Sequence, residues 1–455
     1  MEKRNSFTTG PILGPLIRFA LPVLMALFLQ ALYGAIDLWV VGKFAEAADV
    51  SGVSTGSQIT QTVAIVITGL SMGITVQVGQ KIGEGRPDEA GRAIGSGITL
   101  FLLLALAVSA VMVPGAGAIA RLMQAPAEAL RETTAYVRLC SAGTVFIVAY
   151  NVLGSIFRGI GNSRIPLYTV GIASIFNVAG DLLFVAVLHM GAAGAAIATV
   201  MAQALSVLLS WLLIRRRELP FTLTRADLRM RRPVVGRILG LGIPIALQDL
   251  LVSISFLVIM AIVNTRGVIA SAGVGVAEKI CAFIMLVPSA FEQAMSAFVA
   301  QNVGAGEHRR ARLALRGSVI MSAAMGAAMF YLAFFHGDLL SRLFARDPQI
   351  VAAGADYLRA YGIDCLLTCF LFCFIGFYNG YGKTVLVMVQ GIVGAFAVRI
   401  PIAYIMSRRA ASSLFHIGLA TPSSTIVQIV ICLAALAVLR KKLGGERIMH
   451  TGNTR

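Results

Sequence analysis

The chain has 455 residues, of which 58% are hydrophobic and only 13% are charged. Soluble domains carry about 25% charged residues, so this composition excludes a soluble protein and indicates one that crosses a membrane many times. The net charge of +17 could suggest nucleic acid. However, the basic residues lie in loops on alternate sides of apolar runs, which is the pattern of a membrane protein, and we expect no nucleic-acid partner.

Twelve apolar runs are long enough to span a bilayer, which takes about 20 residues. They cover residues 15–42, 52–80, 93–114, 134–157, 166–188, 193–214, 238–264, 269–299, 314–335, 351–377, 384–406 and 419–439. The longest polar stretch is too short to form a soluble domain. We therefore predict an N-terminal six-helix lobe (1–214), a cytoplasmic basic linker (215–237) and a C-terminal six-helix lobe with a short cytoplasmic tail (238–455).

The two lobes repeat each other at a constant offset of 221 residues. Residues 78–85 recur at 299–306, residues 136–138 at 357–359, and residues 159–161 at 380–382. Six spans per repeat make both lobes enter the membrane in the same direction. The sequence thus predicts an all-α integral membrane fold whose lobes are related by a parallel pseudo-two-fold repeat, an architecture that recurs in secondary transporters.

Lys and Arg set the orientation. With the N-terminus inside, 26 of the 38 basic residues fall in inside-facing segments, Arg158 and Arg164 among them, and ten fall outside. Lys279 and Arg399 lie within spans. This bias predicts a multi-pass protein of the plasma (inner) membrane with both termini in the cytoplasm.

Two carboxylates stand out within the first lobe. Asp37 lies in the outer half of the first span, and Asp181 lies at a similar depth in the fifth. Asn177 is one turn before Asp181 on the same helical face. Thr199 lies at a similar depth in the sixth span, and Gln30 is two turns before Asp37.

These residues form one plausible layer with oxygen ligands and a charge of −2. The layer suits a hard cation such as Na⁺, held by Asp37, Asn177, Asp181 and Thr199. It suits a proton equally well, because two close carboxylates repel when both are ionised. The alternative for Asp37 is a hydrated position near the interface. No cofactor is expected beyond the coupling ion.

The second lobe does not repeat this layer. Val258 and Ile402 stand at the positions that correspond to Asp37 and Asp181. It carries instead three polar candidates for a substrate cavity: Glu278, Asp364 and Arg399. Each of them could equally serve a structural pairing, for example Glu278 with Lys279 or Arg399.

Proline recurs in the first and seventh spans, as Pro22 and Pro244. A proline within a helix frees a carbonyl group and permits a kink. Pro22 is therefore a candidate hinge that could couple cation binding at Asp37 to bending of the first span. Ordinary tolerance of proline in membrane helices is the alternative.

Motifs of soluble enzymes are missing from the sequence. It has no Gly-x-x-x-x-Gly-Lys-Ser/Thr loop for nucleotide binding and no His-Glu-x-x-His zinc motif. We therefore expect that the protein is not an enzyme.

Local motifs resemble those of the multidrug and toxic compound extrusion (MATE) family along essentially the whole chain. They are Ala-Leu-Pro at 20–22, Val-Ala-Gln-Asn-Val-Gly-Ala-Gly at 299–306 and Arg-Ile-Pro-Ile-Ala at 399–403. The pattern Asp37, Asn177, Asp181, Thr199, with Gln30 before it, is also similar to the family's cation site. A second-lobe Na⁺ site of the kind found in some members is not expected, because Val252 stands where they have a glutamate.

The resemblance implies export of amphipathic, often cationic compounds through a cavity between two lobes, driven by inward H⁺ or Na⁺. We expect small-molecule substrates, a lipid bilayer around the protein and a functional monomer. The alternative is a flippase for lipid-linked precursors from the same superfamily. Arg399 and Lys279 are the only cations placed within spans, which is few for binding a pyrophosphate.

Overall fold

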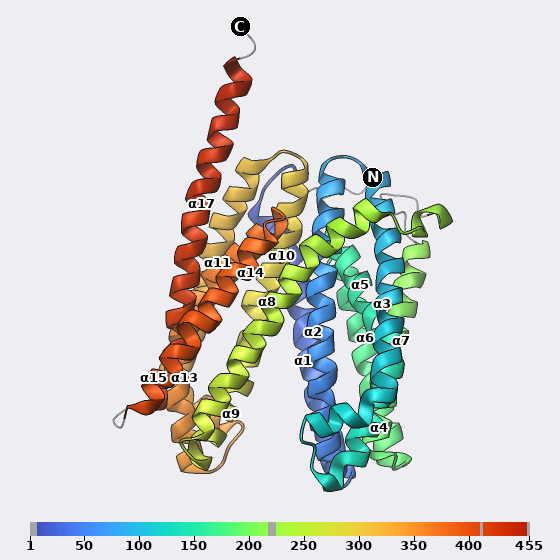
Figure 1. The fold of residues 1–455 in the computed structure, drawn as a ribbon, viewed down its shortest axis with the longest axis vertical. Coiled ribbons are helices and arrows are strands. Elements are labelled where there is room, and N and C mark those ends of the chain that lie inside the picture. The colour runs from blue at the N-terminus through green and yellow to red at the C-terminus, as the bar shows by residue number, and fades with distance from the viewer. Residues whose placement is uncertain (1–6, 217–223, 410–412, 453–455) are drawn as a thin grey trace. The chain divides into compact units, whose positions relative to one another are not determined.

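The computed structural model describes residues 7–216, 224–409 and 413–452, and every regular element within these ranges is helical (Figure 1). The α-helices are α1 (Leu13–Phe44), α2 (Ala47–Gly83), α3 (Pro87–Leu122), α4 (Leu130–Ala142), α5 (Thr144–Gly159), α6 (Arg164–Asp181), α7 (Gly191–Arg216), α8 (Arg232–Asn264), α9 (Val268–Ile284), α10 (Leu286–Gly304), α11 (His308–Phe335), α12 (Gly337–Arg342), α13 (Pro348–Gly380), α14 (Thr384–Ile392), α15 (Ile400–Arg408), α16 (Leu414–Gly418) and α17 (Ala420–Gly452). Four short segments join them: η1 (Ala127–Ala129), η2 (Leu182–Val187), η3 (Arg225–Leu228) and η4 (Val393–Arg399). The predicted all-α fold is confirmed.

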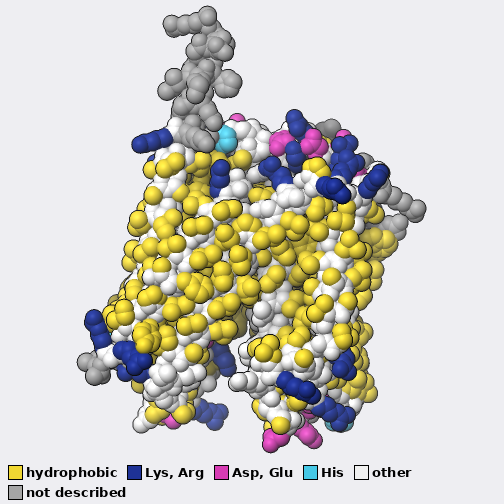
Figure 2. Space-filling model, viewed as in Figure 1, with side chains coloured by type: hydrophobic (Ala, Val, Ile, Leu, Met, Phe, Trp, Pro, Cys, Tyr) yellow, Lys and Arg dark blue, Asp and Glu magenta, His cyan; other side chains and the backbone are white. Residues whose placement is uncertain are grey.

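The described helices supply eleven candidate membrane spans, or twelve if the bent pair formed by 127–142 and 144–159 counts as one span. That pair is the predicted fourth span, and it bends by 53° at Gly143. Glycine is required at the bend, because a Cβ atom there would lie 2.5 Å from the methyl groups of Val200. On the face drawn in Figure 2, hydrophobic side chains cover the helices, and Lys and Arg gather toward the helix ends.

The chain forms two compact units. Unit 1 comprises Met1–Leu250, Gln293–Ala314 and Gly376–Thr384. Unit 2 comprises Leu251–Glu292, Leu315–Ile375 and Val385–Arg455. Unit 1 therefore takes in two short segments from the second repeat.

Within unit 1, α2 packs against α4 and α5, and α6 packs against α1 and α7. Side chains of α2, α3, α5 and α8 share one buried core, which includes Ile74, Phe101, Val152 and Ile238. Most of these helices run side by side in Figure 1. Helices α1, α6 and α7 form the part of this bundle that carries the polar residues predicted from the sequence.

The repeat is also visible in hydrogen bonds inside unit 1. Gln80 Nε2 donates to the carbonyl of Gly380 at 3.1 Å, and Gln301 Nε2 donates to the carbonyl of Gly159 at 2.9 Å. The donors are 221 residues apart, and so are the acceptors. The same offset found in the sequence therefore relates two equivalent contacts in space.

The linker between the lobes is partly docked. Residues 217–223 lie outside the described residues, while η3 packs against α3. Thr99 Oγ1 donates to the carbonyl of Leu228 at 2.6 Å, and Ser96 Oγ donates to that of Arg229 at 3.2 Å. Hydrogen bonds from the side chain and backbone of Thr224 lower the pKa of the exposed Asp227 carboxyl.

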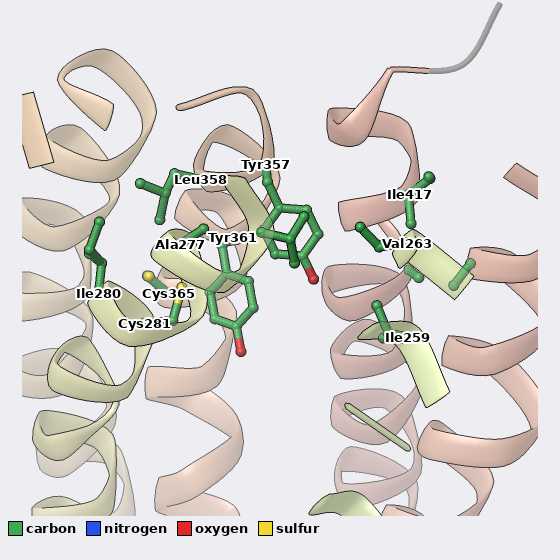
Figure 3. Close-up of a cluster of buried hydrophobic side chains, with 13 residues drawn as sticks. Ile259, Val263, Ala277, Ile280, Cys281, Tyr357, Leu358, Tyr361, Cys365 and Ile417 are labelled. Carbon is green, nitrogen blue, oxygen red and sulfur yellow. The ribbon is translucent and has the colours of Figure 1, made fainter. Parts of the chain in front are cut away.

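Unit 2 has its own buried core between α8, α9, α13 and α16. Figure 3 shows part of it, with Ile259 and Val263 from α8, Ala277 and Cys281 from α9, and Tyr357 and Tyr361 from α13. Both tyrosine side chains are buried. The core therefore places two hydroxyl groups beside the polar residues of the second lobe.

Asp49 joins the start of α2 to the start of α7. Its Oδ1 accepts a hydrogen bond from the Ala192 amide at 2.7 Å, and its Oδ2 accepts one from the Glu46 amide at 3.3 Å. An acceptor at a helix N-terminus satisfies an amide that has no partner within the helix.

We expect Asp49→Ala to lower the free energy of unfolding by about 1–2 kcal/mol, because two amides lose a charged acceptor. Thermal unfolding of the purified protein in detergent measures this loss. Asp49→Asn keeps one acceptor oxygen and should retain about half of the stability. An unchanged unfolding temperature for Asp49→Ala would contradict the cap.

Candidate functional site

The two carboxylates predicted in the first lobe come together in unit 1. Asp37 lies on α1, and Asp181 is the last residue of α6; 7% and 0% of their surfaces are exposed. The Asp37 carboxylate faces the side chains of Asp181 and Asn177. Thr199 Oγ1 on α7 donates to Asp37 Oδ2 at 3.3 Å. Three helices therefore build one polar site inside the apolar bundle.

Small residues and a π-helical segment position these groups. Gly180 lets α6 approach α7, because a Cβ atom there would lie 3.0 Å from Cβ of Ala198. The π-helical segment η2 begins directly after Asp181. The second lobe has its π-helical segment η4 in the equivalent span, ending at Arg399. Such segments often occur at functional sites, because the extra residue changes the direction of the side chains.

Many polar atoms of this site have no hydrogen-bond partner among the residues that the structure describes. They are Asp37 Oδ1, both carboxylate oxygens of Asp181, and Oδ1 and Nδ2 of Asn177. A buried carboxylate without a partner is costly, and two of them facing each other are costlier still. The donor set therefore fits a proton or a small cation with a preference for oxygen ligands, which would replace the missing partners.

Gln30, the fifth predicted residue, is joined to a different partner. Its Nε2 donates to the hydroxyl of Tyr150 on α5, and no described hydrogen bond links it to either carboxylate. The helical register alone suggested proximity to Asp37, but two turns along α1 separate the two side chains. Gln30 lines a larger cavity instead.

A small cavity adjoins the carboxylate site. It is lined by Asn177 and Thr199 together with Tyr33, Tyr150 and Gln203, and its volume of about 10 Å³ is close to that of a single water. Gln203 Nε2 donates to the Tyr33 hydroxyl at 3.4 Å. Sequence reasoning missed Tyr33 and Gln203, although each lies four residues from a predicted site residue on the same helix face.

The three candidates of the second lobe lie in unit 2 around Tyr357. Asp364 Oδ1 accepts a hydrogen bond from Thr425 at 2.6 Å. Arg399 Nη1 donates to Ser255 at 3.0 Å, and its guanidinium carbon lies 4.4 Å from the centre of the Phe256 ring.

Glu278 differs from these two residues, because its buried Oε1 has no hydrogen-bond partner among the described residues. No described ion pair joins Glu278 to Lys279 or to Arg399, and Lys279 is exposed. The partners suggested by the sequence are therefore not seen for this carboxylate.

Pro22 lies inside α1, which continues through it as one helix. Arg158 corrects an expectation: it does not lie in a loop on the inside. It occupies the last turn of α5, where its side chain lines the cavity beside Gln30. The apolar run appeared to end one residue before Arg158, but packing carries the helix on to Gly159.

A duplicated bundle of membrane-spanning helices that buries unpaired carboxylates is typical of secondary transporters. The sequence pattern of the MatE family matches residues 22–183 and 244–405, one match in each half of the chain. The chain belongs to this family, and it is a multi-pass membrane transporter for multidrug efflux, not an enzyme.

Known proteins resemble it over nearly its full length. The probable multidrug resistance protein YpnP of Bacillus subtilis is 26% identical over 89% of this chain and 91% of its own. The probable multidrug resistance protein NorM of Thermotoga maritima is 23% identical over 89% and 86%. A crystal structure of MATE in the straight conformation has the same fold, with a TM-score of 0.90 and 20% identity over 97% of this chain and 100% of that one. These relatives do not favour the flippase alternative.

Proposed function

We propose that this protein is a secondary active antiporter that exports amphipathic, often cationic compounds in exchange for H⁺ or Na⁺ moving inward. The observation that carries the proposal is the buried pair Asp37 and Asp181, whose carboxylate oxygens largely lack partners. Asp37, Asn177, Asp181 and Thr199 would hold the coupling ion. The chemistry that the ion supplies is neutralisation of this negative site.

Coupling follows from the charge of the site. A state with an empty site keeps two carboxylates in an apolar bundle, whereas a state with a bound cation does not. Cation and substrate drive alternating access only if they favour different conformations, because a ligand that binds both states equally shifts nothing. Bending of α1 at Pro22 is the proposed hinge, since α1 carries both Pro22 and Asp37.

Among the residues of the second lobe, Glu278 is the best candidate for binding a cationic group. Its buried oxygen lacks a partner, whereas Asp364 and Arg399 already have neutral partners in Thr425 and Ser255. We therefore assign Glu278 to the substrate and give Asp364 and Arg399 a structural role first.

The proposal includes the cellular setting. The bias of Lys and Arg toward one side supports a plasma-membrane location with both termini in the cytoplasm. All of the proposed coupling residues lie in unit 1 of a single chain, so we propose a functional monomer that requires no cofactor and binds no nucleic acid.

Transport in proteoliposomes with separately imposed pH and sodium gradients tests the proposal. We expect a cationic dye to accumulate only when one of the two gradients is inward for the exporting orientation. A control in which a potassium gradient with valinomycin sets the voltage alone separates ion exchange from a membrane potential. Dye movement that ignores both ion gradients would overturn the antiport.

A further inference from the structure

A second cavity lies inside unit 1, between α1, α2, α5, α6, α7 and α10, and has a volume of about 190 Å³. Its lining is unusual for a binding site of cationic compounds. One charged side chain lines it, that of Arg158, and no Asp or Glu of the described chain does so. The other polar groups are neutral, among them Gln30, Thr68, Tyr150 and Asn151.

Arg158 has no ionic partner within the part of the chain that the structure describes. Its Nη2 donates to Ser155 Oγ at 2.8 Å, while its Nε is buried without a hydrogen-bond partner. Gly154 leaves room for the guanidinium, because a Cβ atom there would lie 3.2 Å from Nη1. An arginine within a membrane bundle is costly unless an anion or water compensates it.

The cavity has space for an aromatic acid. An apolar cavity of about 150 Å³ is large enough for benzene, so this one can hold a ring with a carboxylate. Val23, Leu27 and Phe157 supply apolar surface for the ring. The planar guanidinium of Arg158 matches the geometry of a carboxylate, which it can bind through two parallel hydrogen bonds.

We propose that this cavity binds the aromatic carboxylate end of an amphipathic substrate, with Arg158 as the ligand of the carboxylate. The inference rests on the proposed efflux function and narrows its substrates to compounds that carry an acid group as well as an apolar or cationic part. The rest of such a molecule is too large for the cavity and would extend beyond it.

The cavity also adjoins the cation site. Tyr150 lines both this cavity and the small cavity that Asn177 and Thr199 line. Gln30 donates to the Tyr150 hydroxyl from the wall of the larger cavity. A bound acid would therefore contact the polar groups that lead toward Asp37 and Asp181.

Equilibrium binding of rhodamine B and of its ethyl ester tests the proposal. The two dyes share one cationic ring system, but only the acid carries a free benzoate. We expect fluorescence polarisation, with the purified full chain in phosphatidylcholine nanodiscs, to show about tenfold tighter binding of the acid, the size of a hydrogen-bonded charge contact. Arg158→Gln should remove this preference and change the affinity for the ester less than twofold.

The matched control is Arg164→Gln. Arg164 is an exposed arginine six residues further along the chain and does not line the cavity, so the preference should persist. Equal affinity of the native protein for the two dyes, or an equal loss for both dyes in Arg158→Gln, would overturn the proposal.

A measurement on the native protein keeps the proposal testable if Arg158→Gln does not fold. Benzoate should displace rhodamine B, and the neutral benzamide should not; displacement by neither or by both equally contradicts a carboxylate site. Adding phosphatidylglycerol to the nanodiscs should leave the preference intact, whereas its loss would assign Arg158 to a lipid headgroup. These assays use no ion gradient, so they remain decisive if the antiport proposal fails.

Discussion

Asp37→Asn and Asp181→Asn are each expected to reduce gradient-driven efflux to the level of empty liposomes. Each substitution removes one negative charge from the pair that would bind the coupling ion and leaves an amide of nearly the same size. The remaining carboxylate no longer faces a like charge, so exchange of a cation or proton loses its driving interaction. Dye efflux from proteoliposomes under an imposed pH or sodium gradient measures the effect.

Stability separates this loss of function from misfolding. Removal of one of two facing carboxylates relieves repulsion, so the unfolding temperature in detergent should stay the same or rise. Asp88→Asn is the matched control, because Asp88 is an exposed aspartate in the first turn of α3 and should transport normally. Normal pumping by both site variants would refute the role of the pair.

Gly83→Ala and Gly304→Ala are expected to be the most damaging small substitutions in unit 1. A Cβ atom at Gly83 would lie 1.9 Å from the carbonyl oxygen of Gln301, and one at Gly304 would lie 2.0 Å from that of Gln80. The obstacle is backbone in both cases, so a side-chain rotation cannot relieve it. We expect a loss of about 1–3 kcal/mol or more in the free energy of unfolding.

Thermal unfolding of both variants in detergent checks this expectation, and dye efflux shows whether the α2–α10 crossing is also needed for transport. Gly240→Ala is the control. Gly240 lies inside α8, and a Cβ atom there meets nothing within 4 Å, so alanine should be neutral or slightly stabilising because it favours the helix. Unfolding temperatures of Gly83→Ala and Gly304→Ala equal to that of Gly240→Ala would contradict the close approach.

The apolar runs and the repeat predicted much of the fold. Their lengths and the offset of 221 residues indicated twelve spans in two similar lobes, and the helices agree with this number when the bent pair is counted once. Hydropathy could not predict the bend at Gly143, because its cause is the side chain of Val200, 57 positions away in the chain. It also could not separate Arg158 from a loop residue, since a basic residue at the end of an apolar run has the same pattern in both cases.

For the candidate site, the sequence alone determined which residue types enter the membrane and which of them share a helix face, as Asn177 and Asp181 do. These properties are local, because they depend on hydrophobicity and on the period of the helix. Only the tertiary structure decided that Asp37 faces Asp181, that Gln30 bonds to Tyr150, and that Arg158 lines a cavity. Such contacts join helices far apart in the chain, and they depend on close packing through small residues such as Gly180 and Ala198, which no local pattern specifies.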